Sequence, residues 1–370
     1  MSRPCIGIVG SAGAYGRWLR AFLEQRMGLQ VLGHDPRDPE SARVEEMLDR
    51  AEVLVFSVPI RITPETIRAW IARSAGREAG RLWLDLTSLK TAPVAAMLES
   101  RAEVVGLHPL AAPPKTPTLK GRVLAVCRAR LDRWAPWLEA LLAALEAECV
   151  AVEPERHDRA MALVQAMVHA THLAQAGVLR ESAGTIGDIA ALLPLRSAAF
   201  ELDVAIAARI LSRNPAIYTD IQFDNPHVPG VLRLLAGQLE GIARLVEQGD
   251  EAARSRFRSD VLEANRLAFS EQALATGNRT FERVGYLLAD LADACSLSVH
   301  LPEDRSGSLR GLLQVFERHG VNIVSLHSSR TQAGELHFRF GFDHEVDRAR
   351  LDAVAAAIHA DGIGRVLDTG

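Results

Sequence analysis

The chain has 370 residues, more than one typical domain, which predicts two or three domains, each large enough to bury a core. Its formal net charge of -4, with acidic and basic residues interspersed, argues against nucleic acid or an anionic membrane as the main partner. The 4 cysteines lie far apart without a C-x-x-C pair, so neither a disulfide framework nor a zinc site is indicated. The first apolar run is too short for a signal peptide, and no run is long enough to span a membrane, so we expect a soluble cytoplasmic protein.

Short apolar runs alternate with helical patterns through the first 150 residues. Because these runs lack polar alternation, they predict strands buried on both faces, as in a parallel sheet between two layers of helices. The pattern therefore predicts a doubly wound α/β domain of the Rossmann type at residues 1–150. The expected strands are Ile6–Val9, Gln30–Leu32, Val53–Phe56, Leu82–Asp85, Val104–Leu107 and Val123–Val126.

Three glycines, spaced three residues apart, follow the first expected strand. A helical pattern begins just beyond them at Arg17, so the loop lies at a strand-to-helix junction where helix N–H groups can bind an anion. The spacing is a variant of the G-x-G-x-x-G dinucleotide fingerprint, and an ordinary turn is the alternative interpretation. The residues expected to bind the cofactor here are Gly10, Ser11, Gly13, Ala14, Tyr15 and Gly16.

Two further features favour a dinucleotide. Asp35 ends the second expected strand, where a carboxylate would accept hydrogen bonds from the adenosine ribose and repel a 2′-phosphate, which favours NAD over NADP. Arg37 nearby could instead pair with that phosphate, and Asp35 could be only a turn residue. The segment Ser57, Val58 and Pro59 ends the third expected strand, and its proline exposes backbone at the crevice where ligands bind in open α/β sheets.

Polar side chains also follow the next two expected strands, Ser88 after the fourth and His108 after the fifth. Both should open onto the same crevice, on the nicotinamide side. A histidine there can accept a proton from a substrate hydroxyl while hydride leaves the same carbon, because its ordinary pKa leaves it largely neutral at neutral pH. Ser88 could bond the imidazole or the hydroxyl. A purely structural role for His108 is the alternative.

Residues 151–293 predict a second, almost entirely helical domain. Two segments, Met161–Val168 and Ala205–Ile210, are apolar on much of their circumference, which predicts burial between other helices. A helical domain this apolar often buries a dimer interface, so we expect a homodimer. His169 and His172 form an H-x-x-H pair, but without a third ligand at metal spacing they favour a structural role, and no metal is predicted.

Residues 294–370 change character again and predict a compact βαββαβ unit of the ferredoxin-like α+β class. Alternating segments at Leu297–Leu301, Val321–Leu326 and Glu335–Phe342 are typical of strands, and Ser308–His319 is typical of a helix. A further helix and a short strand complete the unit.

Five motifs occur in the order found in prephenate dehydrogenases, and the chain resembles that family from its start to about residue 293. The motifs are Val9–Gly16, Ser57–Pro59, Asp85–Lys90, Gly106–Pro109 and Ala208–Ile221. The resemblance implies a nucleotide-binding domain followed by a helical dimerisation domain. It also implies oxidative decarboxylation of prephenate to 4-hydroxyphenylpyruvate with NAD, in tyrosine biosynthesis, without a metal ion or covalent intermediate.

The same resemblance implies a role for the motif residues. His108 would take the proton from the hydroxyl on ring carbon C4, and Ser88 would orient that hydroxyl, while hydride moves to the nicotinamide and carbon dioxide leaves. Arg209 matches the family arginine that binds a substrate carboxylate, a task suited to its planar guanidinium. Arg213 is expected to assist from one turn later on the same helix face. A helix-surface arginine is the alternative for Arg209.

Some features depart from the family pattern and leave alternatives open. The family often continues His-Pro-Met-Phe-Gly, whereas His108 is followed here by Pro-Leu-Ala-Ala-Pro-Pro, so the choice between prephenate and arogenate stays open. A non-catalytic amino-acid-binding sensor is an alternative of another class, which the joint retention of His108, Ser88 and Arg209 argues against. A generic 3-hydroxyacid dehydrogenase would need a catalytic lysine, and none is evident in Asp158–Glu181.

The C-terminal unit resembles an ACT domain, a module that binds amino acids, and is most similar to those that bind aromatic ones. Those domains carry Gly-Ala-Leu and Glu-Ser-Arg-Pro where this chain has Gly-Ser-Leu and Ser-Ser-Arg-Thr. The resemblance implies tyrosine or phenylalanine as the feedback effector. A glycine at a strand-to-helix turn can offer bare N–H groups to the carboxylate of such a ligand. A module without a ligand is the alternative. The expected effector residues are Gly307, Ser308, Leu309, Asn322 and Arg330.

Overall fold

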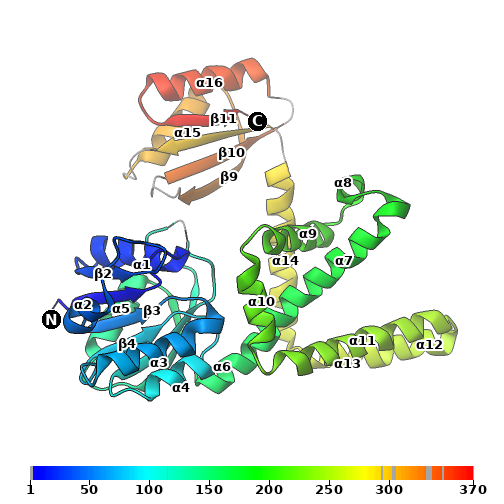
Figure 1. The fold of residues 1–370 in the computed structure, drawn as a ribbon. Coiled ribbons are helices and arrows are strands. Elements are labelled where there is room, and N and C mark those ends of the chain that lie inside the picture. The colour runs from blue at the N-terminus through cyan, green and yellow to red at the C-terminus, as the bar shows by residue number, and fades with distance from the viewer. Residues whose placement is uncertain are drawn as a thin grey trace. The chain divides into compact units, whose positions relative to one another are not determined.

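The computed structural model describes residues 3–114, 116–292, 295–301, 306–330, 336–343 and 346–369. The chain divides into two compact units, Met1–Val261 and Leu262–Gly370 (Figure 1). The first unit contains a large sheet with helices on both faces and a set of long helices. The second contains a small antiparallel sheet with two helices, preceded by a long helix.

The large sheet has seven strands in the order β2-β1-β3-β4-β5-β6-β7. Strands β1 to β5 run parallel, which confirms the Rossmann-like class. Strand β6 runs antiparallel to β5, because a loop without a helix joins the two and a parallel return needs a crossover. The strands are β1 (Ile6–Val9), β2 (Val31–His34), β3 (Val53–Phe56), β4 (Leu82–Asp85), β5 (Glu103–Pro109), β6 (Val123–Arg130) and β7 (Glu148–Ala151).

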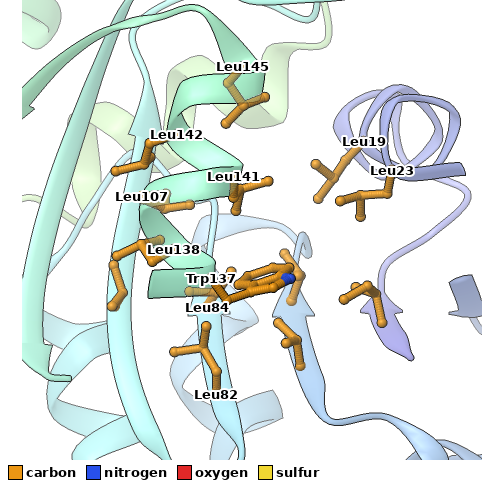
Figure 2. Packing of buried hydrophobic residues seen from close by; sticks show 14 of the residues in the cluster. Leu19, Leu23, Leu82, Leu84, Leu107, Trp137, Leu138, Leu141, Leu142 and Leu145 are labelled. Atoms are coloured by element: carbon orange, nitrogen blue, oxygen red, sulfur yellow. The ribbon is translucent and has the colours of Figure 1, made fainter. Parts of the chain in front are cut away.

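Helices cover both faces of this sheet, as buried strands require. On one face the leucines of α1 and α5 and Trp137 form a buried cluster with side chains of β1 to β6 (Figure 2). On the other face α2, α3 and α4 form a second buried cluster around Trp70 and Trp83. The bounds are α1 (Ala14–Gln25), α2 (Val44–Arg50), η1 (Ile60–Ile62), α3 (Thr63–Ser74), α4 (Thr91–Leu98) and α5 (Ala135–Leu145).

Helices make up the rest of the first unit. The prediction that Met161–Val168 and Ala205–Ile210 are buried between helices holds for Met161, Ala162, Ala166 and Ile210, whereas Val164 is 61% exposed and Ile206 is 36% exposed. The second segment is mostly exposed in the single chain. They are α6 (Pro154–Met161), the π-helix η2 (Ala162–Met167), α7 (Val168–Ile186), α8 (Ile189–Leu192), η3 (Leu193–Leu195), α9 (Ala198–Leu211), α10 (Pro215–Phe223), α11 (Val228–Gln248) and α12 (Glu251–Arg256).

The second unit has the predicted βαββαβ order, with sheet order β11-β8-β10-β9 and antiparallel pairing throughout. Its core joins Phe316, Phe338 and Phe340 to aliphatic side chains of both helices. The π-helix η4 (Phe257–Glu263) spans the boundary of the units. The other elements are α13 (Ala264–Ala268), α14 (Glu271–Ala292), β8 (Ser296–Leu301), α15 (Ser308–Arg318), β9 (Ile323–Arg330), β10 (Leu336–Phe342), α16 (Arg348–Ala360) and β11 (Arg365–Thr369).

Within the described ranges, no helix combines the length and apolar character that a bilayer span requires.

Candidate active site

The glycine loop lies between β1 and α1, where β1 separates β2 from β3. In open α/β sheets, ligands bind at such a switch point, beyond the carboxyl ends of the strands. Gly10 has φ of +86°, and a Cβ there would lie 2.4 Å from the carbonyl oxygen of Ser57. A Cβ at Gly16 would lie 2.3 Å from the carbonyl oxygen of Gly10, so helix α1 begins directly against the loop. Only glycine fits either position.

The first turn of α1 is suited to an anion. Its N-cap residue is Gly13, which offers no side chain to cap the helix, so the first N–H groups are left for an anionic ligand. A Cβ on Gly13 would stand 3.1 Å from the carbonyl oxygen of Gly10 and crowd this cradle. Ser11 is buried beneath the loop, and Ala14 and Tyr15 begin the helix.

Asp35 follows β2 and ties the strand end to the glycine loop. Its Oδ2 accepts the N–H of Ala12 at 3.1 Å, and both of its oxygens accept from the Arg37 guanidinium at 2.9 Å. The hydrogen bonds from Arg37 lower the pKa of Asp35 to about 2 against the opposing effect of burial. The carboxylate is thus ionised and buried, whereas the Arg37 side chain is 71% exposed at the rim.

The segment after β3 joins the sheet to the helical part of the unit. The N–H of Ser57 donates to the carbonyl of Val9 at 2.8 Å, which places Ser57, Val58 and Pro59 beside the glycine loop. A little further on, the N–H of Arg61 donates to Oδ2 of Asp220 on α10 at 3.4 Å. This contact joins the rim of the sheet to α10, the helix that follows the Arg209-bearing α9.

A buried ion pair underlies the Ser88 loop. Lys90 and Asp85 are fully buried and pair with each other, and Lys90 Nζ also donates to the carbonyl of Leu107 at 2.8 Å. Asp85 Oδ1 accepts from the N–H and hydroxyl of Thr87 at 3.1 and 2.7 Å. These bonds fix the loop between β4 and α4, in which Ser88 is half-buried.

His108 lies near the end of β5 and is 3% exposed. Its Nδ1 lies 2.9 Å from Nε2 of His157, and Nδ1 of His157 lies 2.8 Å from Oδ1 of Asp158. Burial, followed by the charges of His157 and Lys90, holds the pKa of His108 well below 6.5. The imidazole is therefore neutral at neutral pH, as a proton acceptor must be.

A loop beside His108 is tied to α1. The hydroxyl of Tyr15 donates to the carbonyl of Ala111, and Nε1 of Trp18 donates to the carbonyl of Thr116 at 3.0 Å. Burial raises the pKa of the Tyr15 phenol, so it stays a donor. The proline-rich loop after β5 is thereby attached to the first two turns of the helix that follows the glycine loop.

The two arginines come from the helical part of the first unit. Arg209 is in the last turn of α9 and Arg213 is in the connection to α10; both are exposed. The expectation that Arg213 lies one turn on along the same helix is wrong, because α9 ends at Leu211 before Pro215 starts α10. Among the described residues, no hydrogen bond or ion pair engages either guanidinium.

The histidine pair on α7 has its own contacts. His172 Nε2 lies 3.3 Å from Asp203 Oδ1, and the ring of His169 packs edge-on against Tyr218. In the described part of the chain, no group of three or more histidine, cysteine, aspartate or glutamate side chains is placed to hold a metal ion.

Three of the expected effector residues begin α15, and the other two lie at the two ends of β9 (Ile323–Arg330). Gly307 is its N-cap residue with φ of +97°, Ser308 is its first residue, and Leu309 packs against the core of the second unit. Asn322 is exposed just before β9. Arg330 ends β9, and its side chain lies outside the described residues.

Sequence reasoning missed His157, Asp158 and the Lys90–Asp85 pair. Each is a charged or titratable residue that is almost completely buried. The adjacent His157 and Asp158 at the start of a helical pattern were the available signal, but nothing in the sequence joins them to His108, 49 residues earlier.

Comparisons with known proteins show what the chain is similar to as a whole. The family model "Prephenate dehydrogenase, dimerization domain" matches residues 153–258, and the model "ACT domain" matches residues 296–362. The "Probable arogenate/prephenate dehydrogenase" of Methanocaldococcus jannaschii is 28% identical over 262 residues, 66% of this chain and 57% of that protein. The "T-protein" of Enterobacter agglomerans is 28% identical over 253 residues, 68% of this chain and 64% of that protein.

The chain is similar to prephenate dehydrogenases over about two thirds of its length, and residues 153–258 match the dimerisation domain of that family. It spans less than two thirds of the length of these two curated relatives. The family fold is confirmed by the prephenate dehydrogenase of A. aeolicus, crystallised with hydroxyphenyl propionate and NAD+. The structural match covers 72% of the present chain and 99% of the A. aeolicus chain, with a TM-score of 0.57 and 17% sequence identity. The second unit carries the ACT domain, at residues 296–362.

Proposed function

We propose that the protein is an NAD-dependent dehydrogenase that oxidatively decarboxylates prephenate to 4-hydroxyphenylpyruvate, a step of tyrosine biosynthesis. The observation that carries this proposal is the position of His108, a buried neutral imidazole at the same carboxyl edge of the parallel sheet as the glycine loop. A base at that edge suits the removal of a hydroxyl proton from a carbon that loses hydride. The family match supports the substrate class.

The loop residues fit a dinucleotide. The glycines leave a cradle that a Cβ would fill, and the uncapped first turn of α1 suits a pyrophosphate. The Asp35 carboxylate would exchange its contact with the exposed Arg37 for the ribose hydroxyls. Bound NAD would supply the hydride acceptor. The residues that would hold it are Gly10, Ser11, Gly13, Ala14, Tyr15, Gly16, Asp35, Ser57, Val58 and Pro59.

The remaining candidate residues would act on the substrate. Nε2 of His108 would receive the proton of the C4 hydroxyl, and Ser88 would orient that hydroxyl by a hydrogen bond. Arg209, with Arg213, would bind a carboxylate, since both guanidinium groups are exposed and none of the described side chains engages them. The C4 hydroxyl becomes a ketone as hydride leaves, and loss of the ring carboxylate as carbon dioxide then makes the ring aromatic.

Arogenate is the second candidate substrate, because the M. jannaschii relative is named for both compounds. Arogenate differs from prephenate by an amino group in place of the side-chain keto group, away from the hydroxyl that His108 would deprotonate. The same base and hydride geometry therefore serve both substrates.

We further propose a cytoplasmic homodimer that is regulated by an aromatic amino acid. We assign dimerisation to a helical domain at residues 151–293, between the cofactor domain at residues 1–150 and the ACT domain at residues 294–370. Large apolar side chains exposed on its helices, including Val178 and Leu234, support an interface there. The name of the matching family model supports it too.

The direct test follows formation of reduced nicotinamide with prephenate and with arogenate, each with NAD and NADP. Turnover of prephenate with NAD is expected, and kcat/KM should stay level down to pH 6.5, since the pKa of His108 lies well below that value. The activity of a base is lost only as the pH falls through its own pKa. Absence of turnover in every pairing would overturn the proposal.

Replacing the base gives the mechanistic test. His108→Asn should lower kcat by about 10² to 10⁴, with little change in the KM of either substrate, because a general base contributes to the transition state. His359→Asn, a change at an exposed histidine on α16, is the matched control and should keep full activity. Full activity of His108→Asn would show that another group is the base.

A further inference from the structure

A chain of three buried side chains runs from the candidate base into α6. His108 contacts His157 at 2.9 Å, and His157 contacts Asp158 at 2.8 Å. All three residues are 2 to 3% exposed. These three hydrogen-bonded side chains thus join a strand end of the sheet to α6, the first helix of the helical part, within one compact unit.

The last member of the chain is held in place from several directions. Asp158 accepts the N–H groups of Lys90 at 2.8 Å and Thr91 at 2.9 Å, so its carboxylate caps the N-terminus of α4. Burial raises the pKa of Asp158, but hydrogen bonds from His157 and Thr91 outweigh that effect and keep the pKa below its usual value. The carboxylate is therefore ionised and can only accept hydrogen bonds.

An acceptor at one end fixes the direction of the first hydrogen bond, and the protonation of His157 then fixes the second. Because Asp158 can only accept, Nδ1 of His157 must donate to it, and in the neutral form of His157 the lone pair is then on Nε2. That lone pair accepts from Nδ1 of His108. The proton of neutral His108 is then on Nδ1, and the lone pair on Nε2 is left for the substrate hydroxyl.

We propose that His157 and Asp158 are positioning residues that hold His108 in the Nδ1-protonated tautomer, so that Nε2 is the atom that takes the substrate proton. This inference rests on the proposed dehydrogenase function for its kinetic consequence and on the hydrogen-bonded chain alone for the tautomer. An aspartate that orients a catalytic imidazole has this role in serine proteases, where its loss gives the wrong tautomer.

No other charged group that the structure describes near His108 can take the place of His157 as its hydrogen-bond acceptor. Lys90 lies close enough to lower the pKa of His108, but its ammonium is already bound by Asp85 and by the carbonyl of Leu107. A cation cannot accept from Nδ1. Of the charged and titratable groups that face His108 from β4, α4 and α6, only His157 offers a hydrogen bond.

The kinetic test removes each link. His157→Leu and Asp158→Asn should lower kcat by about 10²-fold or more, without changing the KM for NAD, because neither residue touches the glycine loop. His157→Gln, whose amide can accept from His108 and donate to Asp158, should recover part of the lost rate. Asn225→Leu is the matched control, since Asn225 Nδ2 donates to the backbone carbonyl of Asp158 at 2.8 Å and anchors the same helix.

The tautomer is measured independently of activity. In protein labelled with ¹⁵N-histidine, with His108→Asn for assignment, the wild-type His108 signal should show a protonated Nδ1 and a bare Nε2. His157→Leu and Asp158→Asn should shift it toward the other tautomer, whereas Asn225→Leu should not. An unchanged tautomer in both variants, or an equal loss of kcat in Asn225→Leu, would overturn the inference. If the wild type turned over no substrate, the proposed function would fail, and this spectrum would still decide the tautomer.

Discussion

At the scale of single residues, we expect Asp35 and Arg37 to decide which dinucleotide binds. The ionised, buried Asp35 would repel a 2′-phosphate, and in the free protein its carboxylate pairs with the exposed Arg37. We therefore expect the wild type to prefer NAD. Asp35→Ser should weaken NAD binding by about tenfold or more, the worth of one charge-assisted hydrogen bond, and should improve NADP binding because Arg37 is released.

Fluorescence titration of the two cofactors measures this preference. Glu40→Gln is the matched control, because it removes one negative charge from an exposed site on the same loop. A variant Asp35→Ser that still preferred NAD as strongly as the wild type would place the discrimination elsewhere.

The buried ion pair of Lys90 and Asp85 should contribute to the stability of the fold. Removing one partner of a buried ion pair leaves an uncompensated charge, so Lys90→Met should lower the free energy of unfolding by about 3 to 5 kcal/mol. The double variant Lys90→Met with Asp85→Asn should regain a large part of that loss, because no charge is then left unpaired. Urea denaturation measures the free energy of unfolding of both variants. An equal loss in the single and the double variant would argue against a stabilising ion pair between Lys90 and Asp85.

At the scale of elements, the sequence predicted the strands whose apolar runs are buried on both faces. It missed β7, a four-residue strand (Glu148–Ala151) whose residues are all exposed although three of them are apolar. It could not predict the reversed direction of β6, which depends on how a loop returns to the sheet. The glycine loop and the strand-end residues followed from their positions after apolar runs. His157 could not be found that way, since its partner lies far away in the sequence.

At the scale of the whole molecule, the ACT domain would act on the candidate active site through coupled binding. If an effector bound to the second unit lowers the affinity of the first unit for substrate, linkage requires the substrate to lower the affinity for the effector by the same factor. The two factors are measurable separately. Their equality would show a true coupling between two sites, whereas competition at one site would prevent joint binding altogether.

The effector prediction can be tested at the start of α15. Wild-type protein should bind tyrosine or phenylalanine in isothermal titration, and Gly307→Val should abolish binding, because a β-branched residue cannot adopt φ of +97° without strain. Asn322→Ala, which introduces no strain, should weaken binding by about tenfold, or about 1.4 kcal/mol, on the scale of allosteric couplings. Gln314→Ala, at an exposed position of α15, is the control and should bind normally.

Turnover without effector should be the same in all of these proteins. If neither amino acid gave heat or changed turnover in the wild type, the domain would be a structural module instead of a sensor.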